Sequence, residues 1–196
     1  MTLGLLIKRM RREDCDGLLP IEHTSDENYW SKEAFEKHID SINCDILVAS
    51  DPMGPVGFLA FERKLNYVQI WNIVVLPKFR LKGVGRLLVS RLQEMIPCEF
   101  DGIRFNVRET NLGAQLFLRR IGFWCDTIAR SYFLDFTIRV SRQEDAYCFD
   151  FNPSVRRNKD VPIRIVSRSN APPAGVCLGA GKRITSLYVF DGDGDC

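Results

Sequence analysis

The order of the predicted elements indicates a mixed α/β domain in which a central sheet is flanked by helices. Stretches of apolar and β-branched residues with the length of strands recur between turn residues, which is typical of a sheet. Other stretches repeat apolar residues at helical spacing, which is typical of amphipathic helices. A chain of 196 residues, 45% of them hydrophobic, can bury one sizeable core and leaves little room for a second full domain.

The first part of the chain predicts one strand, two helices and then three more strands. The first strand covers Leu5–Met10. A helix over Arg12–His23 is favoured by the acidic residues near its start, and Ser31 is a good N-cap for a second helix that extends to about Ile42. A turn rich in Pro and Gly and a two-residue link separate the three strands that follow: Asp45–Ser50, Val56–Arg63 and Asn66–Val75.

Helices and strands alternate in the next part of the chain, up to residue 151. The apolar spacing predicts helices over Gly85–Ile96 and Asn111–Ile121. Between and after them, strands are predicted over Gly102–Val107 and near Phe123–Phe133 and Ala146–Phe151. The complete order is therefore β-α-α-β-β-β-α-β-α-β-β.

The composition changes after residue 151. Residues 152–196 contain four prolines and several glycines, and they show no helical stripe. This predicts a domain over residues 1–151 and a loosely ordered C-terminal extension over residues 152–196. Within the extension, only Arg183–Phe190 has the pattern of a strand.

Charge and cysteine usage exclude several classes of protein. Lys and Arg total 27 against 25 Asp and Glu, so neither nucleic acid nor a membrane is an expected partner. Met1–Leu6 is too short for a secretory signal, and no apolar run reaches membrane-spanning length. The seven cysteines are scattered and lack zinc-ligand spacing. We therefore expect a cytoplasmic protein with buried thiols and no metal site.

The loop Arg80-Leu81-Lys82-Gly83-Val84-Gly85 lies between a predicted strand and a predicted helix. Its two glycines remove the Cβ atoms that would block a close phosphate. The loop leads into a helix N-terminus, where unpaired N–H groups and the helix dipole favour an anion. Arg80, Lys82 and Arg86 add positive charge. These features predict a pyrophosphate-binding loop, although an ordinary glycine turn before a helix would share them.

Two alternative phosphate motifs do not match this loop. A Walker loop needs Gly-Lys-Ser/Thr, and the dinucleotide fingerprint needs a third glycine at the position of Leu88. The loop instead resembles the Gln/Arg-x-x-Gly-x-Gly/Ala motif of the GCN5-related N-acetyltransferase (GNAT) superfamily. Residues 107–123 resemble a later motif of that superfamily, in which an Asn-capped helix closes with Gly-Phe, here Asn111 and Gly122-Phe123.

The resemblance extends over residues 5–151 and is closest to ribosomal-protein alanine N-acetyltransferases. It rests further on Trp30-Ser31, on residues 130–133 and on residues 144–147. It implies a GNAT fold whose sheet is mixed and mostly antiparallel, with a splayed strand pair that holds acetyl-CoA. The residues implied to bind this cosubstrate are Ile73, Val74, Val75, Arg80, Leu81, Lys82, Gly83, Val84, Gly85, Arg86 and Asn111.

The resemblance also implies a reaction, in which the acetyl group of acetyl-CoA moves to a protein or peptide N-terminal α-amine. A ribosomal protein is one candidate acceptor, and Trp30 and Tyr132 would help to hold the acceptor. Val75 would offer its N–H to the thioester oxygen. An acetyltransferase for a small amine or a lysine, and an acyl-CoA-binding module without turnover, remain alternatives.

The chain departs from the family at the two positions where an acid and a base are usual. The acid position holds Leu118 and the base position holds Asn106, and neither side chain can serve these roles. Tyr132 and Glu62 are the tentative catalytic candidates, with Asn72 and Glu109 as further groups that could act through water. An α-amine, with a pKa of about 7.7–8.0, needs less help from a base than a lysine near 10.4 does. The missing base therefore favours an N-terminal amine as acceptor.

Overall fold

The computed structural model describes residues 4–25, 30–97, 99–134, 143–151 and 164–166. The chain divides into two compact units, Met1–Arg104 and Phe105–Cys196. The first unit contains β1 (Leu6–Arg9), the 3₁₀ turn η1 (Arg12–Asp14), α1 (Cys15–Glu22), α2 (Lys32–Asp40), β2 (Cys44–Asp51), β3 (Gly54–Arg63), β4 (Tyr67–Val75), the 3₁₀ turn η2 (Pro77–Phe79) and α3 (Val84–Met95).

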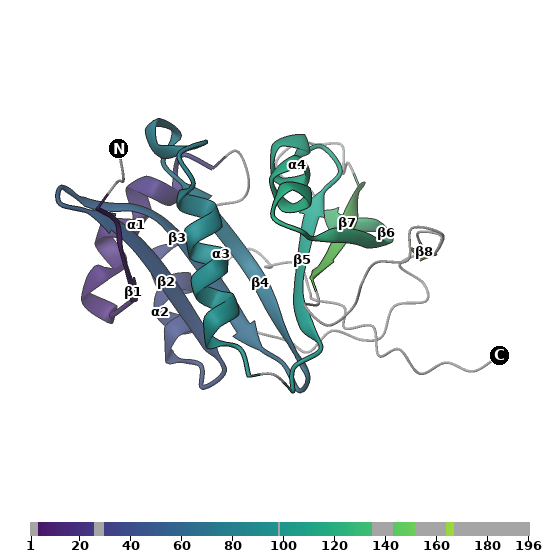
Figure 1. Ribbon diagram of the computed structural model, residues 1–196, viewed down its shortest axis with the longest axis horizontal. Coiled ribbons are helices and arrows are strands. Elements are labelled where there is room, and N and C mark those ends of the chain that lie inside the picture. Colours follow the sequence, from purple (N-terminus) through teal and green to yellow (C-terminus); the bar gives the residue numbers. More distant parts are fainter. Residues whose placement is uncertain (1–3, 26–29, 98, 135–142, 152–163, 167–196) are drawn as a thin grey trace. The chain divides into compact units, whose positions relative to one another are not determined.

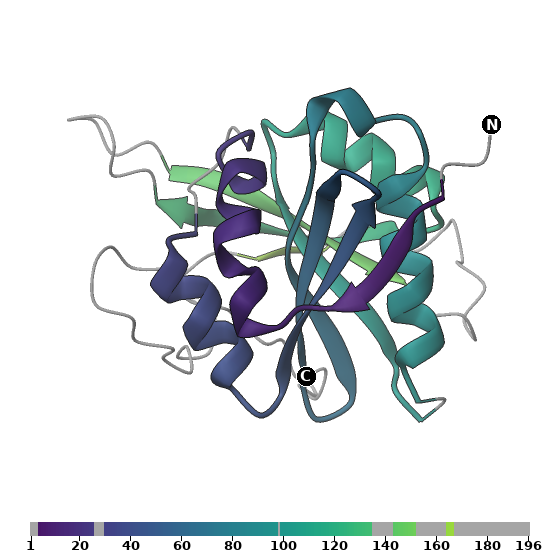
Figure 2. The same ribbon diagram turned by 90° about the vertical axis from the view of Figure 1, so that its left-hand side faces the viewer.

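Strands β1 to β4 of the first unit form an antiparallel meander in chain order. Helices α1 and α2 pack against β3 and β2 on one face, and α3 packs against β2, β3 and β4 on the other. Figure 2 shows the purple and indigo helices α1 and α2 on one side of these strands and the teal helix α3 on the opposite side.

An apolar core lies between the sheet and the helices α1 and α2. Its fully buried members include Leu18 and Phe35 on the helices and Phe58 on β3. The ring of Phe35 meets that of Phe58 edge-on, with centroids 5.3 Å apart. This packing explains why the short helix α2 is ordered, since isolated helices of nine residues are unstable in water.

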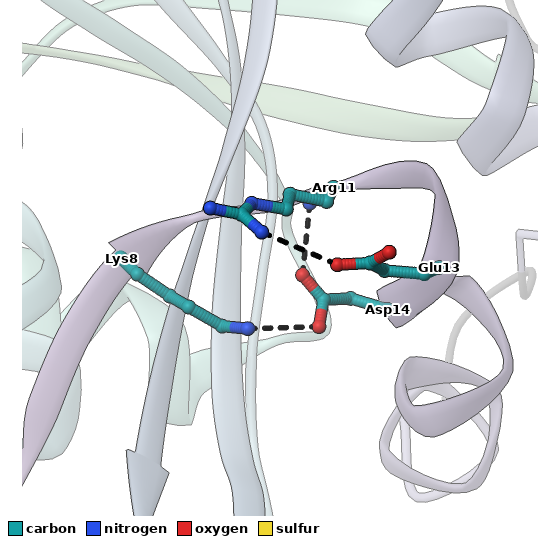
Figure 3. A network of polar contacts seen from close by, with 4 residues as sticks. All are labelled: Lys8, Arg11, Glu13 and Asp14. Carbon is teal, nitrogen blue, oxygen red and sulfur yellow. Dashed lines mark hydrogen bonds and ion pairs between the residues drawn. The ribbon is translucent and has the colours of Figure 1, made fainter.

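A polar network joins β1 to the start of α1 (Figure 3). The carboxylate of Asp14 accepts hydrogen bonds from Lys8 Nζ and from the backbone N–H of Arg11, each at 2.8 Å. Although burial acts to raise it, these hydrogen bonds lower the pKa of Asp14 below its usual value. Glu13 receives a weaker contact of 3.4 Å from the Arg11 side chain. The network fixes the direction in which the chain leaves β1.

The second unit combines one helix with a small mixed sheet (Figure 1). Strand β5 (Gly102–Arg108) crosses the boundary between the units and leads into α4 (Leu112–Arg120). The strands β6 (Trp124–Leu134), β7 (Gln143–Phe151) and β8 (Arg164–Val166) follow. Their order is β5-β7-β6-β8, with β7 antiparallel and β8 parallel to β6. The predicted order of elements is confirmed, and the sheet is mixed and mostly antiparallel.

Four details differ from the sequence prediction. The first helix begins as the 3₁₀ turn η1, because the Asp14 carboxylate accepts a hydrogen bond from the Arg11 N–H across that turn. Helix α2 ends at Asp40 rather than near Ile42, since Ser41 is already extended and Ile42 is 97% exposed. The turn η2 and the strand β8 were not predicted, and three residues give too short a pattern to show a strand. The predicted strand over residues 183–190 lies outside the described residues.

The end of β4 lies close against β3 at a glycine. Gly57 is paired with Val75, and a Cβ atom built on Gly57 would lie 2.9 Å from the carbonyl oxygen of Val74. It would also lie 3.3 Å from the Cα of Val75. Because both contacts are to backbone, they can be relieved only by moving β4. Gly57 therefore sets the position of the strand end from which the chain leaves the sheet toward residues 80–86.

We expect Gly57→Ala to lower the free energy of unfolding by about 1–3 kcal/mol, the usual effect of overpacking a core. Urea denaturation measures this change. Gly17→Ala is the matched control, because its new methyl group would meet only Pro55 at an ordinary 3.5 Å and Ala favours the helix α1. The control is expected to gain about 0.5–1 kcal/mol. Equal effects of the two substitutions would contradict the close-approach explanation.

Candidate active site

The predicted coenzyme loop has the backbone of an anion-binding turn. Leu81 has a left-handed conformation with φ 59°, and Gly83, the N-cap of α3, has φ 87°. The first N–H groups of the twelve-residue helix α3 have no partner within the helix by its geometry, so they can donate to a phosphate. The side chain of Leu81 is 98% exposed and therefore has no packing role that would explain its strained backbone. The residues predicted for pyrophosphate binding fit that ligand.

The basic side chains of this loop have different environments. Lys78 and Lys82 lie near the Phe79 ring, with their Nζ atoms 5.2 and 5.5 Å from its centroid. Arg80, by contrast, donates from Nε to the Val75 carbonyl oxygen at 3.0 Å and from a terminal nitrogen to that of Thr24 at 3.1 Å. Arg80 therefore ties the end of β4 to the chain just after α1.

Strand β4 carries the residues predicted to hold the thioester. Its pairing with β3 steps from Ala60–Asn72 to Phe61–Ile70, so Trp71 is the extra residue of a β-bulge. Beyond the bulge, Val74 is buried, while Ile73 and Val75 are half-buried. The N–H of the following residue, Leu76, bonds to the Val56 carbonyl, which marks the last link between the two strands. Whether Val75 donates to the thioester stays a prediction.

Glu22 is a functional candidate that was not among the predicted site residues. It lies at the C-terminal end of α1, and its side chain is 0% exposed. Its carboxylate accepts hydrogen bonds from Asn72 Nδ2, at 3.0 Å to Oε1 and 3.1 Å to Oε2. It also accepts one from the Trp30 backbone N–H at 2.9 Å. Its position four residues after the buried Leu18 places it on the apolar face of the helix, and that spacing is the signal available in the sequence.

Trp30, predicted to contact the acceptor, packs within the first unit. Its ring centroid lies 5.4 Å from that of Phe35 and 5.0 Å from that of His38. The residue is half-buried, and its backbone is held by Glu22. The packing and the predicted contact with an acceptor are compatible, because part of the residue remains accessible. The structure thus brings Trp30, Glu22 and Asn72 together at one place.

Glu62, the tentative base, already has close partners. Its Oε1 lies 2.7 Å from Lys64 Nζ, and its Oε2 accepts a hydrogen bond of 3.0 Å from the Trp71 indole N–H. These contacts engage both oxygens of the carboxylate. Glu62 therefore acts first as the anchor that holds the bulge residue Trp71.

The site residues of the second unit are fixed locally. Asn111 caps α4 as predicted, with its side-chain oxygen accepting from the Ala114 N–H at 3.0 Å. The adjoining turn is held by Gln115, whose Nε2 donates to the carbonyl oxygens of Arg108 and Glu109 at 3.2 and 2.9 Å. Asn106 is half-buried on β5. These contacts explain why the turn from β5 into α4 is well defined.

Leu118 and Tyr132 are the remaining positions of interest in the second unit. Leu118 on α4 is 0% exposed, so the position of the usual family acid lies in the core. Tyr132 belongs to β6, in an irregular part of its pairing with β7, and its side chain lies outside the described part of the chain. Within the described ranges, no group of three or more His, Cys, Asp or Glu side chains is arranged to hold a metal ion. No helix there is long and apolar enough to cross a membrane.

A comparison with known protein families identifies the class of protein to which this fold belongs. Residues 6–123 match the model of the acetyltransferase (GNAT) family. The chain therefore belongs to this family and is an acetyltransferase of the GNAT type. No curated protein sequence matches it.

Solved structures share the fold at low sequence identity. The ribosomal-protein-S18-alanine N-acetyltransferase of Escherichia coli is 21% identical with a TM-score of 0.66, covering 81% of this chain and 99% of that one. Naa20 of Chaetomium thermophilum, in complex with a bisubstrate analogue, is 20% identical with a TM-score of 0.71, covering 84% and 97%. Arabidopsis thaliana NAA60, in complex with acetyl-CoA, is 16% identical with a TM-score of 0.64, covering 76% and 99%.

We expect Gly83→Ala to weaken acetyl-CoA binding about tenfold, because a left-handed alanine costs roughly 1–2 kcal/mol. The new side chain itself would meet no atom within 4 Å, so the effect comes from the backbone. Isothermal titration with acetyl-CoA measures it. Gly54→Ala is the matched control, since Gly54 also has a positive φ, 134°, but lies in the turn between β2 and β3. Equal loss of affinity in both variants would contradict a local role for Gly83.

We expect the stability of the protein to fall as the pH drops from about 7.5 to about 5.5, with His38 as one cause. Burial lowers the pKa of His38 below 6.5, although its contact with the Phe61 carbonyl at 3.0 Å acts in the opposite direction. The unfolded chain then binds a proton that the folded chain refuses, so acid favours unfolding. Urea denaturation of His38→Gln is expected to show a shallower dependence on pH. The exposed His23 is the control, and His23→Gln with the same flattening would argue against His38.

Proposed function

We propose that this chain transfers the acetyl group of acetyl-CoA to the α-amine of a protein N-terminus. The observation that carries the proposal is the left-handed loop at Leu81 and Gly83, which opens onto the N-terminus of α3. Membership of the GNAT family makes acetyl-CoA the acetyl donor to expect at this loop. The acceptor is inferred from the chemistry of the side chains and from the kind of enzyme among the structural neighbours.

To bind acetyl-CoA, the protein needs groups that hold the pyrophosphate and a hydrogen-bond donor for the thioester carbonyl. The N–H groups at the start of α3 would bind the pyrophosphate, with the positive charges of Lys82 and Arg86 nearby. The strand residues Ile73, Val74 and Val75 would bind the pantetheine arm, with the Val75 N–H directed at the thioester oxygen. The family resemblance implies that Asn111, which caps α4 through its side-chain oxygen, contacts the same arm.

The proposed N-terminal acceptor is supported by the residues at the two positions where the family usually has its acid and its base. Leu118 is buried and has no proton to give, and Asn106 is not a base. A leaving thiol with a pKa near 8.5 departs with little help from an acid. An α-amine is partly neutral near neutral pH, whereas a lysine is almost wholly protonated. A site with weak acid and base groups therefore suits a protein N-terminus better than a lysine.

The experiment is release of free CoA thiol from acetyl-CoA with short peptides that start with Ala, Ser or Met. We expect release with at least one of them and none with the same peptide blocked at its N-terminus. Release only with polyamines, small metabolites or a lysine side chain would overturn the N-terminal acceptor. Binding of acetyl-CoA without release for any amine would instead show an acyl-CoA-binding module. A peptide with the N-terminal sequence of a ribosomal protein tests the resemblance to ribosomal-protein alanine N-acetyltransferases.

The same assay tests the two tentative catalytic residues. Tyr132→Phe removes only a hydroxyl, and Glu62→Gln removes only a charge. If the Tyr132 hydroxyl serves the leaving thiolate, kcat falls in Tyr132→Phe while acetyl-CoA affinity is kept. Glu62 is bound by Lys64 and Trp71, so a loss in Glu62→Gln with normal stability would show a role beyond those contacts. Unchanged kcat/KM in either variant removes that residue from the mechanism.

A further inference from the structure

The buried carboxylate of Glu22, at the C-terminal end of α1, is hydrogen-bonded to strand β4. Glu22 has no exposed surface, and three hydrogen bonds of 2.9–3.1 Å reach it from Asn72 Nδ2 and the Trp30 N–H. A buried charge is costly unless such donors surround it, so its presence in this small core calls for an explanation. Packing alone would be served better by an apolar residue, as at the neighbouring Ile21.

One partner of Glu22 lies next to a residue proposed to bind acetyl-CoA, and the other is a residue proposed to hold the acceptor. Asn72 directly follows the bulge residue Trp71 and directly precedes Ile73, the first residue proposed for the pantetheine arm. Trp30 is the residue proposed for the acceptor. A single carboxylate therefore fixes the backbone at Trp30 and the side chain at Asn72, and both contacts lie inside the first unit.

The hydrogen bonds to Glu22 also determine how the Asn72 amide is turned. A carboxylate accepts hydrogen bonds and cannot donate, so the Asn72 NH₂ group must face Glu22. In a planar amide the carbonyl oxygen then faces away from the carboxylate. Asn72 is only half-buried, so part of the residue is accessible. Its amide oxygen is a neutral acceptor on the strand proposed for the thioester.

We propose that Glu22 is a positioning residue that acts through Asn72, whose carbonyl oxygen accepts a hydrogen bond from the acceptor amine. This inference rests on the proposed function and names the group that recognises its amine. A neutral amide oxygen suits this task, because a carboxylate in direct contact would hold the amine as an ammonium ion, which cannot attack a thioester. Glu22 thus orients the Asn72 amide, while the Asn72 side chain separates the negative charge of Glu22 from the amine.

The first test is Glu22→Gln, assayed by CoA release and by binding of an Ala-initial peptide to the CoA-bound protein. The new amide puts an N–H group in place of one carboxylate oxygen, so at least one of the two contacts that orient the Asn72 amide is lost. We expect kcat/KM and peptide affinity to fall about ten- to a hundredfold, the range for a lost hydrogen bond to a charged group. Acetyl-CoA affinity is expected to stay unchanged, because the hydrogen bonds that Glu22 makes to Asn72 and Trp30 do not involve the loop at residues 80–86.

The matched control is Asp16→Asn, which removes a carboxylate from the same helix at an exposed position. Asp16 forms an ion pair with Lys32 at 2.7 Å, a contact that involves neither Asn72 nor Trp30. We expect this control to keep the activity and the peptide affinity of the wild type. A Glu22→Gln variant with wild-type kcat/KM and peptide affinity overturns the proposal. So does a variant whose acetyl-CoA affinity falls as much as its peptide affinity, since that shows only a damaged fold.

The second test is the double variant Glu22→Gln/Asn72→Asp, which exchanges donor and acceptor. The new amide at position 22 can donate to the new carboxylate at position 72 and still accept from the Trp30 N–H, and position 72 keeps an oxygen on its far side. We expect peptide affinity to recover relative to Glu22→Gln. The new negative charge beside the amine raises the amine pKa, so the rise of kcat/KM with pH should move to higher pH. A double variant without recovery, or with an unshifted pH profile, overturns the proposal.

These measurements distinguish failure of the positioning role of Glu22 from failure of the proposed function. If the wild type neither binds nor acetylates any peptide N-terminus, the N-terminal acceptor is wrong, and the proposed contact with its amine falls with it. If the wild type acetylates peptides but Glu22→Gln does so equally well, only the positioning role is wrong. The peptide-binding measurement decides between these outcomes even for a protein that binds its acceptor without turnover.

Discussion

The close pairing of β3 with β4 is the constraint on which the site in the first unit depends. Gly57 allows the two backbones to approach at Val74 and Val75, and β4 leaves the sheet immediately afterwards. The turn η2, the loop with its left-handed residues and helix α3 all follow from this exit point. A shift of β4 along or away from β3 would therefore move the strand proposed for the pantetheine arm and the loop proposed for the pyrophosphate together.

Two side chains join β4 to the part of the chain near the end of α1. Arg80 joins the carbonyl oxygens of Val75 and Thr24, and Glu22 joins Asn72 to the Trp30 backbone. Both connect the C-terminal region of α1 with β4. Strand β4 and the chain segment that carries Trp30 are thus fixed to each other by polar contacts as well as by the apolar core. This arrangement is suited to a reaction between two substrates, whose reacting atoms must meet within a narrow range of positions.

Much of the fold was predictable because it depends on local patterns. Strand alternation, helical spacing and the caps at Ser31 and Asn111 gave the correct order of elements. The glycine loop was recognisable because Gly83 supplies a backbone conformation that few residues adopt. The ends of elements were less predictable, as at Ile42, where one extended residue ended a helix that the spacing would have continued.

The contacts of the candidate site were less predictable because they join residues far apart in the chain. Glu22 and Asn72 are 50 residues apart, and no local pattern relates them. The partners of Glu62 were missed for a different reason. Trp71 reaches Glu62 across the β3–β4 pairing, whose register shifts at a bulge, and a bulge leaves no clear mark in a single sequence.

The buried Leu118 limits how the chemistry of this chain can change over evolutionary time. A tyrosine at this position would have to enlarge a filled core and bury a phenol hydroxyl there, and both changes destabilise a protein. A change of Leu118 to tyrosine by itself is therefore expected to destabilise the fold rather than to supply a proton donor.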